Sequence, residues 1–263
     1  MRRFAVLLVF LLFLAACGGG ATPATTTEGT ESEAALSGEL FVFAAASLTD
    51  AFEEIKTAFN KENPDVTVTY NFGPSSGLAD QIVQGGPADV FASANQTQMD
   101  KVADASLSSG DSQVFVTNAL QIAVETGNPL GIQGLEDLAR PDVTLVLAAP
   151  EVPAGQFAME VLAGAGVEAS PASLEVDVRA VLQKVALGEA DAGIVYVTDV
   201  QVADDMVDGV DIPEDQNVVA SYPIAPLANA ANPDAAQAFV AFVAGDEGQA
   251  ILGSYGFRSP QPQ

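Results

Sequence analysis

The stretch LFVFAAASLTDAFEEIKTAF, residues 40–59, places a short apolar strand directly before an amphipathic helix. Three alanines follow the strand, and apolar residues from Ala51 to Phe59 then recur at helical spacing. Ser47, with Asp50 three residues later, predicts the helix start. The first turn of a helix leaves backbone N–H groups unpaired and carries about half a positive charge. This junction can therefore hold an anion without a cationic side chain, although a single junction is equally consistent with an ordinary structural cap.

Two junctions further along the chain have the same character. The alternating strand 66–70 turns into Ser75, Ser76 and Gly77, which precede another helical pattern. The apolar strand 143–147 leads to Pro153, Ala154 and Gly155 at the start of a third helix. Hydroxyls and small residues at these helix starts would let a ligand approach the backbone, but each junction alone is also typical of a capped loop.

A fourth junction combines a capping residue with a tyrosine. Asp177 is predicted to cap a helix that begins at Val178 and ends at Gly188. The next strand pattern runs out to Tyr196 and Thr198, where a phenol can offer one hydroxyl donor to a pocket. By itself Tyr196 is also consistent with a core aromatic residue. The alternation of strands and helices predicts an α/β fold with mostly parallel sheets.

The N-terminal residues predict secretion. A basic start precedes an apolar run, residues 4–14, that is too short to cross a bilayer as a mature helix. Residues 1–16 are therefore interpreted as a signal peptide. The sequence at Cys17 is similar to the lipobox of bacterial lipoproteins, in which this cysteine carries the lipid. Residues 17–37 are rich in Gly, Thr, Ala, Ser and Glu and predict a flexible tether. We expect an extracytoplasmic protein that is lipid-anchored to the cell membrane.

The composition excludes several classes of function. The chain has 9 Lys and Arg against 35 Asp and Glu, with a formal net charge of −26, and its basic residues are scattered, which excludes a nucleic-acid partner. It has no histidine and a single cysteine, which removes His-based catalysis and zinc sites of the His or Cys type. No Gly-rich phosphate loop occurs. The sequence therefore indicates a binding protein rather than an enzyme.

Seven motifs together resemble the periplasmic molybdate-binding proteins that serve ABC importers. They occur in family order and span most of the folded part: FAAASLTDA at 43–51, FGPSSGLA at 72–79, GPADVFASA at 86–94, VPAG at 152–155, DVR at 177–179, GIVY at 193–196 and YGF at 255–257. The resemblance implies a two-lobe periplasmic-binding-protein fold of type II. Each lobe would be a mostly parallel sheet flanked by helices, with the ligand in the interlobe cleft.

The resemblance also implies the ligand and its contacts. In that family a tetrahedral oxyanion, molybdate or tungstate, is held by neutral donors, with no cofactor and no metal other than the metal centre of the oxyanion itself. The positions that match are Ser47 and Ser75 as hydroxyl donors, Ala154 and Val178 as backbone N–H donors, and Tyr196 as a phenol donor. The implied partners are an ABC permease and its ATPase, and the protein would be a monomer that meets the membrane only through its lipid.

The chain is expected to cross between the two lobes twice, near residues 117–118 and 221–223. The first lobe would then comprise residues 38–117 plus 222–263, and the second residues 118–221. Ser47 and Ser75 would lie on one side of the cleft and the other three donors on the opposite side. A ligand that bridges them would favour closure, because the closed form gains contacts that the open form lacks.

Several alternatives stay open at this point. Ser76 could replace Ser75 as the second hydroxyl donor. Another oxyanion, such as sulfate, would suit the same donors, whereas an iron(III) binder is disfavoured because the chain has no histidine and no adjacent tyrosines. An enzyme on the same two-lobe scaffold would show turnover. A lipid-anchored structural or adhesive protein would bind no small ligand at all.

Overall fold

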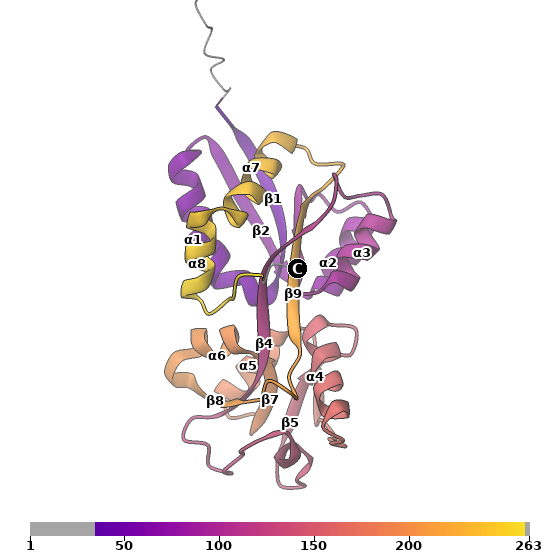
Figure 1. Ribbon diagram of the computed structural model, residues 1–263, viewed down its shortest axis with the longest axis vertical. Helices are drawn as coiled ribbons and strands as arrows, with labels where there is room; N and C mark the ends of the chain where they lie inside the picture. Colours follow the sequence, from indigo (N-terminus) through magenta and orange to yellow (C-terminus); the bar gives the residue numbers. More distant parts are fainter. Residues whose placement is uncertain (1–34, 261–263) are drawn as a thin grey trace, which may run out of the picture. The chain divides into compact units, whose positions relative to one another are not determined.

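The computed structural model describes residues 35–260 (Figure 1). The predicted signal peptide, the predicted lipid-attachment residue Cys17 and nearly all of the predicted tether lie outside the described residues. Nine strands form a mixed sheet in the order β2-β1-β3-β9-β4-β7-β5-β6, with β8 paired to β4. None of the helices in the described part of the chain combines the length and the apolar character needed to cross a membrane.

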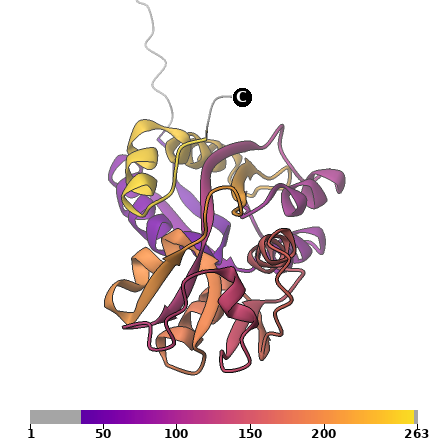
Figure 2. The ribbon, with the colours of Figure 1, turned by 60° about the horizontal axis from the view of Figure 1, so that its bottom comes forward.

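The first lobe is built on three parallel strands. β1 (Gly38–Ala45) pairs in parallel with β2 (Val66–Gly73) and with β3 (Val90–Ala92). The helices of this lobe are α1 (Thr49–Glu62), α2 (Ser75–Val83), α3 (Gln96–Asp104), α7 (Pro233–Ala244) and α8 (Asp246–Ser254). Both views show α1, α7 and α8 on one side of the sheet and α2 and α3 on the other (Figure 1 and Figure 2).

The second lobe repeats this arrangement with different elements. β5 (Leu145–Ala148) pairs in parallel with β6 (Ser173–Glu175) and with β7 (Ala192–Tyr196). The helix α4 (Pro153–Gly164) lies on one side of these strands, and α5 (Val178–Ala186) and α6 (Val197–Ala203) lie on the other (Figure 1). The 3-10 helices η2 (Leu135–Ala139) and η3 (Asp204–Met206) and the strand β8 (Val207–Asp211) complete it.

Two long antiparallel strands connect the lobes. The first half of β4 (Gln113–Glu125) pairs with β9 (Val219–Pro226), and its second half, from Leu120 onward, pairs with β7 and β8. β9 in turn pairs with β3. The crossing points expected near 117–118 and 221–223 fall inside these two strands. The sheet is therefore parallel where each lobe is separate and antiparallel where the chain passes between them.

The amphipathic pattern of residues 51–59 explains how α1 packs. Phe52, Ile55 and Phe59 are almost fully buried, and the ring of Phe239 on α7 lies edge-on to both Phe52 and Phe59. The helix begins one residue later than a cap at Ser47 would place it. Residues Ala46–Leu48 form a short 3-10 helix, η1, and Thr49 Oγ1 donates to the Ala46 carbonyl. The prediction that Ser47 caps this helix is wrong, because its hydroxyl makes no capping bond and lies beside the phenol of Tyr222.

Candidate functional site

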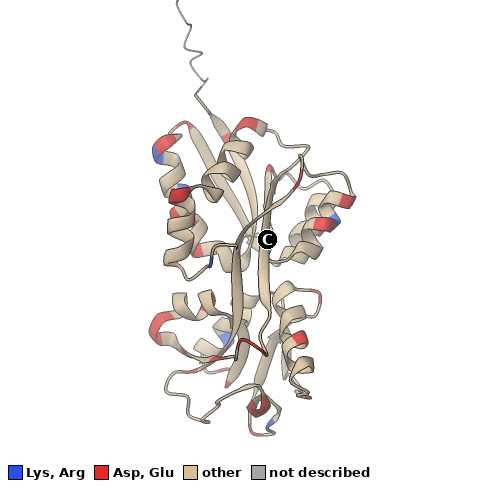
Figure 3. Cartoon of the chain, in the orientation of Figure 1, with Lys and Arg blue, Asp and Glu red and all other residues tan. Residues whose placement is uncertain are grey.

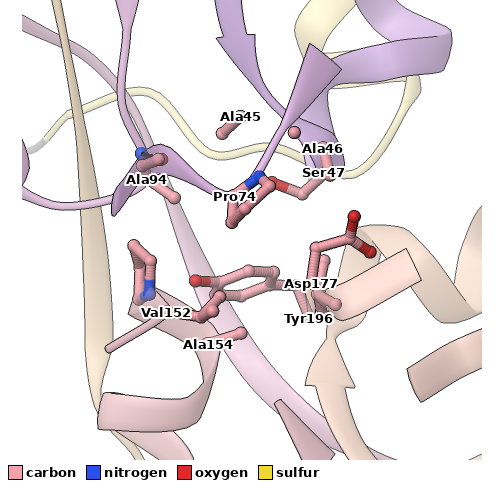
Figure 4. A pocket seen from close by; sticks show the side chains of 13 residues that line it. Ala45, Ala46, Ser47, Pro74, Ala94, Val152, Ala154, Asp177 and Tyr196 are labelled. Atoms are coloured by element: carbon pink, nitrogen blue, oxygen red, sulfur yellow. Dashed lines mark hydrogen bonds between the residues drawn. The ribbon is translucent and has the colours of Figure 1, made fainter. Parts of the chain in front are cut away.

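A small pocket lies where the carboxyl ends of the parallel strands of both lobes meet. Its 13 lining residues include all five predicted donors, namely Ser47, Ser75, Ala154, Val178 and Tyr196. Its empty volume is about 220 Å³, whereas three larger hollows, one of which shares Pro74 and Val152 with it, measure about 1180 to 1220 Å³ including open solvent. Figure 4 shows Ser47, Pro74 and Ala94 of the first lobe facing Val152, Ala154 and Tyr196 of the second. The space suits a small ligand held from two sides.

Four helix starts point their first turns at this pocket. Ser75 is the first residue of α2, Ala154 the second residue of α4 and Val178 the first residue of α5, while Ser47 lies in η1 just before α1. N–H groups in a first turn have no acceptor within their own helix. Each helix start also contributes partial positive charge. The backbone alone therefore makes the pocket a donor-rich, electropositive environment.

Gly155 explains why the start of α4 can come so close to the preceding strand. A Cβ atom at this position would lie 2.1 Å from the carbonyl oxygen of Ala149 and 2.4 Å from that of Ala148. The chain folds back from β5 so tightly that no side chain fits. This glycine brings the N–H of Ala154 into the pocket, so the sequence motif at 152–155 has a steric reason.

The two serines present their hydroxyls in similar settings. Ser75 Oγ accepts a hydrogen bond of 3.0 Å from the backbone N–H of Ala94, which leaves its own hydrogen free to donate. Ser47 Oγ lies 2.9 Å from the phenol oxygen of Tyr222, a distance that fits a hydrogen bond in either direction. Both serines are buried. Ser76, the alternative to Ser75, does not line this pocket but an adjoining hollow that shares Pro74 and Val152 with it.

Tyr196 contributes a phenol from the end of β7. The side chain is 1 % exposed, and its hydroxyl lies beside the phenol of Tyr222 without a well-formed hydrogen bond to any described residue. Burial raises the pKa of Tyr196 well above its usual value, so the phenol keeps its proton and remains a donor. The expected strand end at Thr198 is wrong, because β7 ends at Tyr196 and α6 begins at Val197.

No Lys or Arg is among the described residues that line the pocket. The single charged lining residue is Asp177, whose carboxylate accepts a 2.9 Å hydrogen bond from the N–H of Ala180, as its predicted capping role requires. Figure 4 shows this carboxylate turned away from the space between Ser47 and Ala154. Figure 3 shows acidic positions spread over both lobes and few basic ones. An anion in this pocket would thus rely on dipoles rather than on a cation.

Arg179, which follows the lining residue Val178, contacts two carboxylates. Its Nη2 lies 2.6 Å from Asp50 Oδ2 on α1, and its Nε lies 2.9 Å from Asp199 Oδ1 on α6. Burial raises the pKa of Asp199 to about 6, against the opposing effect of Arg179. This cluster also connects the lobes, since Asp50 belongs to the first and Arg179 to the second. A second bridge runs from Asn95 Nδ2 to Gln156 Oε1 at 2.8 Å.

Sequence reasoning missed part of the site. Ala94 and Pro74 lie within or beside quoted motifs, yet no pattern marked them as lining residues. Tyr222 was predicted only as part of a chain crossing, and a tyrosine in a strand gives no sign that its hydroxyl reaches a serine 175 residues away. Within residues 35–260, no three His, Cys, Asp or Glu side chains cluster in a way that could hold a metal ion.

Comparisons with known proteins identify the family of this chain. The model of the bacterial extracellular solute-binding protein family matches residues 40–258. The molybdate-binding protein ModA of Mycobacterium tuberculosis is 42% identical over 250 residues, which cover 94% of this chain and 93% of that protein. A solved structure from Clostridium difficile, described as the substrate-binding domain of a molybdenum ABC transporter, is 32% identical, with a TM-score of 0.66 and coverage of 85% of this chain and 99% of that one.

One solved structure shows the fold alone. The sulfate-binding protein SubI of Mycobacterium tuberculosis has a TM-score of 0.76 at 19% identity and covers 85% of this chain and 88% of its own. These likenesses confirm the predicted two-lobe α/β fold of the periplasmic binding proteins, and the family is extracytoplasmic. The chain belongs to the bacterial extracellular solute-binding proteins, and within them it resembles the molybdate-binding members.

Proposed function

We propose that this protein captures molybdate, and tungstate with it, and delivers the oxyanion to an ABC importer. The observation that carries the proposal is the pocket itself, which gathers three hydroxyls and four helix starts and has no Lys or Arg among its described lining residues. The proposed contacts are the hydroxyls of Ser47, Ser75 and Tyr196 and the backbone N–H groups of Ala154 and Val178. The names of the molybdate-binding relatives support the same ligand.

The energetics suit a doubly charged oxyanion. A hydrogen bond to an ionised acceptor is worth about 1.5 to 3 kcal/mol when well aligned, and several of them together can offset the desolvation of a small dianion. A protonated oxyanion would set its own O–H against a protein donor and leave both unsatisfied. Fully ionised molybdate and tungstate avoid this conflict at neutral pH, whereas hydrogen phosphate does not.

We further propose a binding role without catalysis, and a lipid anchor at Cys17. Among the described residues Asp177 is the only carboxylate that lines the pocket, and it caps the N-terminus of α5. A monomer with residues 17–37 as a tether would let the folded part meet a permease and its ATPase at the membrane. Replacement of Cys17 by Ser is expected to release the protein from the membrane fraction of cells that express it. Retention of that variant at the membrane would contradict the lipid anchor.

Calorimetric titration of the purified protein tests the ligand. We expect one site that binds molybdate and tungstate, with sulfate and phosphate failing to compete at comparable concentrations. Sulfate also carries two charges without a proton, so only the spacing of the donors can reject this smaller ion. Equal affinity for sulfate would refute the specificity and leave the fold untouched. Measurable turnover of any oxyanion ester would favour an enzyme on this scaffold.

A further inference from the structure

We propose that Tyr222 is a positioning residue for the oxyanion site. It donates its phenol hydrogen to Ser47 Oγ and so leaves the Ser47 hydroxyl hydrogen free to point at the bound ligand. Tyr222 is not itself among the residues that line the pocket, and it is fully buried on β9. Its oxygen lies 2.9 Å from Ser47 Oγ. The inference rests on the proposed function, since it concerns how that site is tuned.

The neighbouring serine shows what the site requires. Ser75 Oγ accepts a hydrogen bond from the N–H of Ala94, a group that can only donate. This bond occupies one lone pair of the Ser75 oxygen and keeps its hydrogen free to point elsewhere. At Ser47 the same role falls to a phenol, which can either donate or accept. A phenol is the more acidic of the two hydroxyls, so it is the better donor and the serine oxygen the better acceptor.

A bound anion removes the remaining ambiguity. If Ser47 donated to Tyr222, the serine oxygen would turn its lone pairs toward a negatively charged ligand, and a favourable contact would become a repulsive one. If Tyr222 donates, the hydrogen bonds run in one direction, from Tyr222 to Ser47 and from Ser47 to the oxyanion. Bonds aligned in this way polarise and strengthen one another. Burial raises the pKa of Tyr222, so the phenol keeps the hydrogen that this chain of bonds needs.

The arrangement also bears on selectivity. With its oxygen already occupied by Tyr222, Ser47 has less capacity to accept a hydrogen bond from a protonated ligand. Without the Tyr222 hydroxyl, the Ser47 hydroxyl can rotate and accept as readily as it donates. Tyr222 therefore favours fully ionised oxyanions over hydrogen phosphate, an effect that simple packing of its ring would not produce.

A Tyr222→Phe variant removes the hydroxyl and keeps the ring. The ring packs edge-on against Tyr196 at 5.8 Å and Phe257 at 5.6 Å between centroids, and phenylalanine preserves both contacts. Tyr255→Phe is the matched control, since it removes a phenol whose only described partner is Glu54 on an exposed part of α1. The full set is the wild type, Tyr222→Phe, Ser47→Ala, the double variant and the control.

Calorimetry with molybdate, tungstate, sulfate and hydrogen phosphate is applied to each protein. We expect Tyr222→Phe to bind molybdate about two- to tenfold more weakly, the range for one neutral hydrogen bond, and to lose part of its preference for molybdate over hydrogen phosphate. In the Ser47→Ala background the same change should have no further effect. Tyr255→Phe should match the wild type.

The outcomes separate this inference from the proposed function. If Tyr222→Phe binds as the wild type does, or if it weakens binding equally with and without Ser47, the positioning role is overturned. If the wild type prefers sulfate, the proposed function fails. The positioning role is then tested by comparing the sulfate affinities of the wild type and Tyr222→Phe. If the wild type binds none of the four oxyanions, both proposals fall.

Discussion

Replacing Tyr196 by Phe is expected to weaken ligand binding without weakening the ligand-free fold. The Tyr196 hydroxyl lines the pocket and is buried, and it lies beside the phenol of Tyr222 without a well-formed hydrogen bond, so its removal costs little within this part of the protein. Phenylalanine keeps the edge-on contact with the ring of Tyr222. The unfolding free energy of the free protein should therefore change by less than about 0.5 kcal/mol or rise slightly.

The loss in affinity follows from the kind of bond that is removed. A hydrogen bond to an ionised acceptor is worth about 1.5 to 3 kcal/mol, which corresponds to a dissociation constant roughly 10- to 150-fold higher. Ligand at about 1,000 times the wild-type Kd stabilises the wild type by about 4.1 kcal/mol. For a variant with about 100-fold weaker binding, the same concentration gives only about 1.4 kcal/mol.

Thermal and urea unfolding with and without molybdate, together with calorimetry, measure both quantities. Tyr70→Phe is the control with the opposite expectation, because Tyr70 donates a 2.7 Å hydrogen bond to the Phe52 carbonyl and does not line the pocket. That variant should lose about 1 kcal/mol of stability and keep its affinity. If Tyr196→Phe bound molybdate within twofold of the wild type, the reasoning about this phenol would be refuted.

Three further changes test other parts of the site. Ser47→Ala should weaken molybdate binding about 10- to 150-fold in calorimetry. Ala154→Ser should keep the affinity within about threefold, because only the backbone N–H of residue 154 is expected to contact the ligand. A larger loss in Ala154→Ser than in Ser47→Ala would contradict the assigned roles. Gly155→Ala should cost at least about 1 to 3 kcal/mol in urea unfolding, since its Cβ would lie 2.1 Å from the Ala149 carbonyl oxygen, and a stable variant would show that this turn can relax. The buried carboxyl of Asp199 has its pKa raised from 3.8 to about 6, so its protonated form stabilises the fold below about pH 4 and this contribution is lost as the pH rises to about 6. At about 1.4 kcal/mol per pKa unit, the loss in unfolding free energy between about pH 4 and 6 is roughly 3 kcal/mol. The stability of the wild type relative to Asp199→Asn should fall by about this amount over the same range. A stability difference that does not change with pH would disprove the raised pKa of Asp199.

Local patterns predicted most of the elements that form the site. The Asp177 cap of α5 and the proline at the start of α4 both lie where periodicity and capping residues predicted them. These features depend on neighbours a few residues away, which a single sequence displays directly. The same kind of reasoning failed at Ser47, because a serine before a helix has the same local pattern whether it caps the helix or bonds a distant phenol.

The sequence by itself determined the type of chemistry in this protein. Small or hydroxyl residues at four helix starts and the absence of histidine indicated that neutral donors would hold an anion. Tertiary structure alone decided which groups meet. Strand order brings Tyr222 to Ser47 and Arg179 to Asp50 across 175 and 129 residues of chain. Such contacts follow from the pairing of β4, β7 and β9 rather than from any local pattern, and so no stretch of sequence records them.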